Sequence, residues 1–266
     1  MKGLAIFTAV LMLVPLAATA GGLELHVSGG PARAMLAEQN AIIVRYDKLI
    51  DHLNEILGLL PNVEGTVPQI GVIGTGLSFA AGERYWITQS LALGGSVSYF
   101  DATSGSQGAY LSLDTDATSE ILFHFRTRLL QAILQAELRF LDAGVVLAAA
   151  ASFGYHYSLV DTQSLFEIPE EYPETLSQLP PEIDGRFTGG GWGGDVALSV
   201  SYPFLSWMGV RAEVSYRYLP LVLTDDDRQP LDLDGNGTPE RVNFGGFAVR
   251  VGLSFHVDLT APDGKE

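Results

Sequence analysis

The chain has 266 residues, which is enough for one large domain or two small ones. Its formal net charge of −16 disfavours nucleic acid as a partner, because phosphates need basic side chains. It contains no cysteine, which excludes disulfides, thiol nucleophiles and thiolate metal sites.

Residues 1–20 have the pattern of a secretory signal peptide. Lys2 supplies the positive end, residues 4–16 form the apolar core, and Ala18, Thr19 and Ala20 form a small-residue cleavage site. The alternative is a transmembrane anchor, which needs about 20 apolar residues, more than this run provides. We therefore expect export and cleavage near Gly21.

The N-terminal segment, residues 21–66, is predicted to carry one amphipathic helix over about residues 31–60. Pro31 suits a first helical turn and Pro61 would end the helix. Apolar residues recur every seven positions, at Leu36, Ile43, Ile50 and Leu57. This seam fits either a helix that lies on its own barrel or on the membrane surface, or a coiled coil through which the chain self-associates.

Residues 67–258 contain segments in which every second residue is apolar. A period of two is typical of strands with two different faces. The predicted strands are 67–80, 87–102, 119–140, 145–160, 189–202, 207–222 and 244–257. Short connections alternate with long ones, as in barrels with short periplasmic turns. We therefore predict an all-β fold, a closed antiparallel transmembrane β-barrel of about eight strands, followed by a polar tail at 259–266.

The eighth strand has two candidates. Residues 23–28 would place the helix on the long-loop side, whereas residues 108–115 would leave it on the periplasmic side. We favour the second slightly, because it keeps the helix away from the barrel mouth. In the third segment the apolar parity flips at Leu129–Leu130, and we expect a β-bulge there.

If the apolar side chains at every second position face lipid, the side chains at the positions between them face the lumen. An arginine facing lipid at mid-depth would cost about 2–4 kcal/mol, so arginines are expected inside, paired with acids. An eight-stranded interior is just wide enough to be filled by side chains, so these pairs should seal or narrow the lumen. The predicted lumen residues are Glu137, Arg139, Asp195, Arg211, Glu213, Arg217 and Arg250.

Aromatic residues near the strand ends suggest a belt at each membrane surface. The expected short-turn belt is Trp86, Phe140, Tyr202, Phe204, Trp207 and Phe255, and the expected long-loop belt is Tyr99, Tyr155, Tyr157, Trp192, Tyr216, Tyr218 and Phe247. With the signal peptide and the alternating segments, the chain resembles the small bacterial outer-membrane barrels of the OmpA/OmpW type. This architectural resemblance implies an outer-membrane location, lipid and the barrel-assembly machinery as partners, and a structural or porin-like role. Such families end with an aromatic residue near the C-terminus, whereas here the polar tail follows Phe255 and Val257.

Two motifs suggest other functions. Asp232, Asp234, Asn236 and Glu240 resemble the front half of a calcium loop, although Asn243 stands where a bidentate glutamate is expected. This motif is either a weak calcium site, making a calcium-stabilised surface binding module, or an acidic turn, and the sequence implies no other cofactor. Ser158 and His156 share a strand face, which gives an outer-membrane lipid-modifying enzyme as a further alternative to the main expectation of no enzyme activity.

Overall fold

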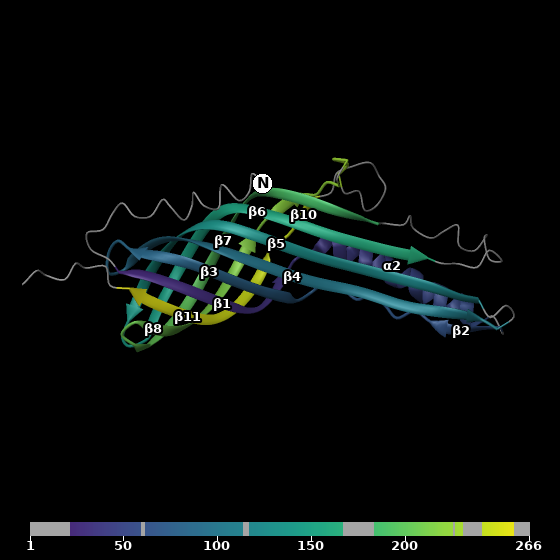
Figure 1. Ribbon diagram of the computed structural model, residues 1–266, viewed down its shortest axis with the longest axis horizontal. Helices are drawn as coiled ribbons and strands as arrows, with labels where there is room; N and C mark the ends of the chain where they lie inside the picture. Colours follow the sequence, from purple (N-terminus) through teal and green to yellow (C-terminus); the bar gives the residue numbers. More distant parts are fainter. Residues whose placement is uncertain are drawn as a thin grey trace, which may run out of the picture.

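The computed structural model describes residues 22–59, 62–113, 117–166, 184–225, 227–230 and 241–257. Within these ranges eight antiparallel strands form a closed ring in the order β1-β3-β4-β5-β6-β7-β8-β11, and β11 pairs again with β1 (Figure 1). The predicted all-β fold with about eight strands is confirmed. The bounds of the ring strands are β1 Leu23–Ala34, β3 Gly76–Trp86, β4 Leu91–Ser112, β5 Ala117–Asp142, β6 Val146–Phe166, β7 Gly185–Leu205, β8 Met208–Tyr218 and β11 Gly246–Val257.

Four further elements among the described residues are not part of the ring. The helix α2 (Ala37–Gly58) and the short strand β2 (Val63–Thr66) connect β1 to β3, and β2 pairs with the far end of β4. The strands β9 (Pro220–Val222) and β10 (Arg241–Asn243) pair with each other. The expected signal peptide and polar tail lie outside the described residues and remain predictions.

The strand β1 closes the barrel. It pairs along its length with β11 on one side and β3 on the other, so Leu23 lies beside both Val257 and Tyr85. The favoured eighth strand, residues 108–115, is wrong, because β4 continues without a turn to Ser112 and pairs residue by residue with β5. The barrel therefore begins at Leu23, not at residue 67, and the helix lies on the long-loop side.

Two predicted boundaries differ from those of the structure. The helix begins at Ala37 instead of Pro31, because residues up to Ala34 still pair with their strand neighbours. The predicted strand 67–80 starts only at Gly76, and residues 67–75 form an extended segment that lies against α2. We call residues 67–75 the strap.

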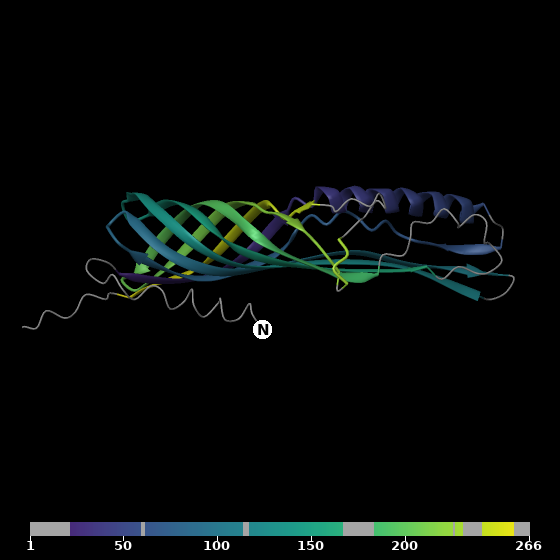
Figure 2. The ribbon, with the colours of Figure 1, turned by 90° about the horizontal axis from the view of Figure 1, so that it is seen from above.

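The strands of the ring differ in length by a factor of about two. β4 to β7 have 21 to 26 residues, whereas β1, β3, β8 and β11 have 11 or 12. The longer strands continue past the barrel on the long-loop side as an open sheet. Figure 2 shows this sheet as one layer and α2 as a second layer that runs along it.

The apolar face of β5 changes sides where the strand leaves the barrel. Its odd-numbered side chains point inward throughout: Phe123 and Leu129 are buried in the apolar core, and Gln131 and Glu137 are buried in the lumen. The predicted bulge at Leu129–Leu130 is wrong, because pairing with β4 is continuous there and the register shift with β6 lies between Arg139 and Leu141. The parity flip instead marks the point at which the outer surroundings change from lipid to water.

The helix covers the inner face of the sheet extension. The seam residues Leu36, Ile43 and Ile50 are at most 1% exposed, and the ring of Tyr46 packs edge-on against Phe123 at 5.2 Å between centroids. Burial raises the pKa of Tyr46 to about 12. The apolar seam of α2 is therefore buried against other parts of the same chain. This agrees with the interpretation in which the helix lies on its own barrel. No helix among the described residues is long and apolar enough to cross a membrane.

Side chains of α2 bind the main chain of the strap. Asn54 donates to and accepts from Val67 (2.9 and 3.0 Å), and Asn40 does the same with Ile73 (3.0 and 2.8 Å). Between them the amide of Ile70 donates to Asp47 at 2.6 Å. Because the strap lies outside the sheet, these bonds satisfy main-chain groups that would otherwise be buried without partners.

The outer face of the barrel is apolar. Leu134, Val196 and Val251 are more than half exposed. They are examples from a band of large apolar side chains around the ring. Such a surface is unfavourable in water, whereas in lipid the closed ring leaves no unpaired strand edge. Closed barrels with an even number of strands are characteristic of bacterial outer membranes. The chain is an outer-membrane β-barrel.

Aromatic side chains lie at both ends of the apolar band. On the long-loop side Tyr99, Tyr157 and Trp192 are exposed, as expected. On the short-turn side Tyr202 is exposed, whereas Trp86 is 7% exposed. Trp86 has the inward parity of β3, so its indole belongs to the lumen and not to the belt.

The position of α2 predicts a labelling pattern. The chain has no cysteine, so Val44→Cys on the exposed side of α2 and Gln89→Cys in the turn at 87–90 each introduce a single thiol. If the short turns face the periplasm, a membrane-impermeant maleimide added to intact cells should label position 44 and not position 89. Both positions should react after the outer membrane is permeabilised. Labelling of position 89 alone in intact cells would contradict the outer placement of α2.

Candidate functional site: the barrel lumen

A buried ion-pair network crosses the lumen. Glu24 of β1 and Arg84 of β3 are direct cross-strand partners, with a carboxylate–guanidinium distance of 2.9 Å. The other end of the Arg84 guanidinium donates to Glu137 of β5, on the far side of β4. Arg211 of β8 reaches the same carboxylate with two bonds, of 2.7 and 3.2 Å. Glu137 therefore joins two arginines from separate parts of the ring.

The network continues to the strands that close the barrel. Arg211 also contacts Glu213 at 3.2 Å, and Glu213 binds Arg250 of β11 at 2.6 Å. Arg84, Glu137 and Arg211 are at most 4% exposed. Charges buried this deeply are tolerated only when they are paired, so each member depends on the others.

The structure places the other predicted lumen residues around this network. Arg139 lies at the short-turn end, where it binds Asp142 at 2.9 Å and stacks over Trp86 at 3.9 Å from the ring centroid. Arg217 donates to Gln131 and to the carbonyl of Phe244, both at 3.0 Å. Asp195 accepts a hydrogen bond from Ser152 at 3.3 Å.

Glu24 and Arg84 are missing from the predicted set. The sequence pattern makes residues 23–28 the less favoured eighth strand and predicts a turn at residues 81–86. The inward parity of Glu24 and His26, opposite the outward Leu25 and Val27, is the signal that could have revealed β1.

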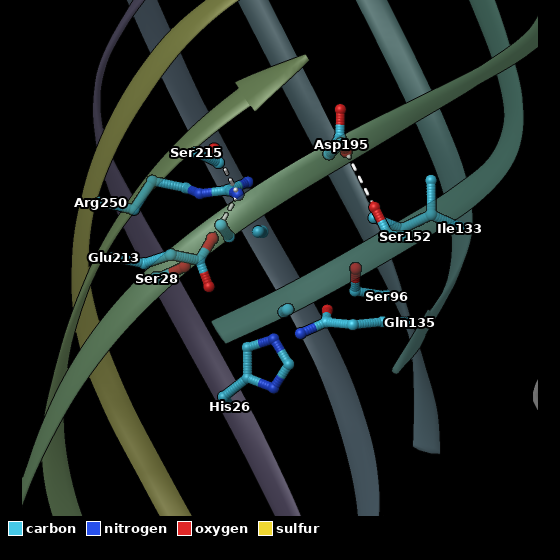
Figure 3. Close-up of a pocket in the computed structure, with 13 residues that line it drawn as sticks. His26, Ser28, Ser96, Ile133, Gln135, Ser152, Asp195, Glu213, Ser215 and Arg250 are labelled. Carbon is cyan, nitrogen blue, oxygen red and sulfur yellow. Dashed lines mark hydrogen bonds and ion pairs between the residues drawn. The ribbon is translucent and has the colours of Figure 1, made fainter. Parts of the chain in front are cut away.

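A small cavity lies beside the network. Asp195, Glu213, Arg250 and His26 point into it from different strands, as Figure 3 shows. The space for water is about 20 Å³, enough for about one or two molecules. Among the described residues, His26 Nδ1 and Asp195 Oδ1 have no hydrogen-bond partner, so this site is suited to ordered water.

An apolar core closes the lumen on the long-loop side. The segment that follows β8 folds into the barrel mouth and buries Leu219, Leu221 and Leu223, each at most 3% exposed. These leucines pack against glycines of β7. A Cβ on Gly191 would lie 2.7 Å from Leu221, and one on Gly193 would lie 2.8 Å from Leu219, so larger residues would displace the segment.

The structure gives little support to the other candidate sites. Ser158 and His156 are fully buried, and the Ser158 hydroxyl donates to the carbonyl of Arg128 instead of to the histidine. The His156 ring contacts Gln131 at 2.8 Å. The predicted calcium loop, residues 232–240, lies outside the described residues. No cluster suited to a metal ion is present in the described part of the chain.

The network predicts a large loss of stability when Glu137 is truncated. Glu137→Ala leaves Arg84 and Arg211 buried without their shared carboxylate, which should cost about 3–5 kcal/mol. Urea unfolding in detergent, followed by tryptophan fluorescence, measures the change. The matched control is Glu55→Ala on the exposed face of α2, which should change stability by less than about 0.5 kcal/mol. Equal effects of the two substitutions would contradict the role of the network.

Comparisons with known proteins give similarity of structure only. The chain matches no protein-family model and no curated protein sequence. Among solved structures it is similar to the outer membrane protein OprG from Pseudomonas aeruginosa, with 10% identity, a TM-score of 0.39, and coverage of 89% of this chain and 96% of that one.

Two further solved structures are similar to the chain. The outer membrane protease OmpT from Escherichia coli shares 12% identity, with a TM-score of 0.34 and coverage of 88% and 96%. The outer membrane protein AlkL in lipid bilayers shares 13% identity, with a TM-score of 0.33 and coverage of 92% and 93%. With similarities this low, the assignment as a barrel rests on the chain's own strand pairing and lipid-facing exterior.

Proposed function

We propose that the protein has a structural role, as a closed outer-membrane anchor that holds the sheet extension and α2 outside the membrane. The observation that carries this proposal is the filled lumen. Charged pairs cross its middle and an apolar core covers its long-loop end.

The polar middle of the barrel supports closure over conduction. A pore needs a continuous path that is open to water. Here the side chains of Arg84, Glu137 and Arg211 bridge strands on different sides of the ring and so lie across that path. The cavity beside them is large enough for only about one or two water molecules. A small-solute channel is the competing function, and it would require these pairs to separate.

The long-loop end supports the same conclusion. Leu219, Leu221 and Leu223 lie in one apolar core with Leu36 and Phe244, directly above the polar lumen. Moving an ion through this core would mean taking its charge out of water without a partner, which costs several kcal/mol or more. The extension above this core consists of a sheet and a helix whose outer faces are exposed, which suits a scaffold.

Planar-bilayer recording tests the proposal. The purified wild-type barrel should give no discrete conductance steps at moderate voltage. The comparison variant combines Arg84→Ala, Glu137→Ala, Leu219→Ser and Leu221→Ser, which removes both the ion pairs and part of the apolar core. This variant should conduct, provided that its heat-modifiable gel mobility shows a folded barrel. Regular single-channel steps from the wild-type protein would overturn the structural role in favour of the channel.

A further inference from the structure

Arg217 and Asp195 are lumen residues of opposite charge that stay out of the ion-pair network. The arginines of the network each bind a carboxylate. Arg217 binds no carboxylate among the described residues. In the same part of the chain Asp195 accepts only the 3.3 Å bond from Ser152, and its Oδ1 atom is buried without a partner. One cation and one anion of the lumen are therefore left without each other.

Arg217 and Asp195 are nevertheless neighbours. They lie opposite each other in the ladder of β7 and β8, where the Cα atoms of partner residues are about 5 Å apart. The Asp195 carboxylate points into the lumen cavity (Figure 3). A change of side-chain rotamer is enough for an arginine to reach a carboxylate at this distance, so the pair can form without movement of the strands.

Arg217 instead holds the segment that closes the long-loop end of the barrel. We call residues 219–224 and 241–244 the plug, because their apolar side chains are buried over the polar lumen. The Nε of Arg217 donates to the main-chain carbonyl of Phe244 at 3.0 Å, and its Nη1 donates to Gln131 at 3.0 Å. A hydrogen bond from a charged donor is stronger than one between neutral groups. Arg217 therefore ties the plug to the polar lumen.

The plug has few main-chain hydrogen bonds to the ring, as far as the described residues show. The ladder of β7 and β8 ends at Gly194 and Tyr218, and one further bridge joins Thr188 to Thr224. Between these two points the leucines of the plug rest on glycines of β7. Such packing contacts can separate without breaking the ladder, so the bond from Arg217 is a large part of the polar attachment.

We propose that Arg217 is a latch with two positions. In the position seen here it holds the plug through the Phe244 carbonyl. In the second position it pairs with Asp195, and the plug lifts away from β7. The second position gives the buried carboxylate the partner that it lacks here, and this stabilises the lifted arrangement. The exchange is therefore between two arrangements that each satisfy a different buried group.

Lifting the plug uncovers the lumen cavity but does not open the barrel. His26 and Gln135 of the cavity lie nearer the long-loop end of their strands than Glu24 and Glu137 of the network. The ion pairs therefore still cross the lumen below the cavity when the plug is lifted. This inference rests on the closure proposed above, and it names the residue that keeps the long-loop end covered.

Thiol labelling of the plug tests the latch in the purified barrel. Val242→Cys places the only thiol of the chain at a β10 position that is 0% exposed, so iodoacetamide should react with it only when the plug lifts. In this background Arg217→Gln should speed labelling about tenfold, because the bond from a charged donor is lost. Asp195→Asn removes the partner of the second position and should slow labelling at least about threefold.

Controls at the other end of the lumen match both substitutions. Arg139→Gln and Asp142→Asn remove the same charges at the short-turn end and should change the labelling rate by less than about twofold. Ala148→Cys is a buried reporter near that end, and it should label far more slowly than position 242. If Arg217→Gln lacks the heat-modifiable gel mobility of a folded barrel, Asp195→Asn alone decides.

The slower labelling of the Asp195→Asn variant is the critical result. If Arg217 had only a structural role, labelling in this variant would be unchanged or faster, because its nearest acid is lost, and either result would overturn the latch. Equal labelling of positions 148 and 242 would show that the whole barrel opens and would also overturn it. Conductance of the wild-type barrel would refute the closed anchor without changing these rates.

Discussion

The structure depends on one constraint: a strand that leaves lipid for water must exchange the face that carries its apolar side chains. In β5 this exchange occurs between Leu129 and Leu130, with no break in the pairing to β4. On the membrane side of this point the apolar side chains face outward and the inward face is polar. Beyond it the apolar side chains face inward and need a cover, because the sheet there is no longer closed.

The helix α2 meets this need, and the chain path explains why it can. Because β1 runs from the short-turn end to the long-loop end, the chain emerges where the longer strands continue past the barrel. The seam of α2 then covers the apolar inner face of β4 and β5. The strap fills the gap between the helix and β4, where the Ser104 hydroxyl lies 2.8 Å from the Ile70 carbonyl oxygen and 2.6 Å from that of Gly71 and can donate to either. The polar lumen and the apolar extension are thus consecutive parts of one interior.

Much of the barrel could be predicted from its alternation. The outward parity of β11, the inward arginines and the short turns follow from a period of two, because the membrane imposes opposite environments on the two faces. The part of the β4–β5 hairpin that continues beyond the barrel could not be identified in this way. Between Thr103 and Gly108, β4 carries polar residues and glycine on both faces, which is typical of a loop in sequence, and only pairing with β5 makes it a strand.

The lumen was predictable in composition but not in connectivity. Arg211, Glu213 and Arg250 lie on strands with clear alternation, so their inward direction could be inferred. Which acid each arginine meets depends on the stagger of the strands around the ring, and this is not visible in any single segment. Glu24 and Arg84 show the limit most clearly, since Glu24 lies in the less favoured candidate for the eighth strand and Arg84 lies in a predicted turn.

The closing pair of strands has a consequence for how the molecule is built. The hairpins from β3 to β8 join neighbours in the chain and can form as soon as their residues are available, whereas the pairing of β1 with β11 has to wait for the last strand. Contacts between segments far apart in sequence form slowly, because the loop between them loses the most entropy. The helix follows β1 directly, but its binding surface belongs to β4 and β5. The segment that contains β1 and α2 can therefore join β3, β4 and β5 first, so the helix layer can be completed before the pairing of β1 with β11 closes the barrel.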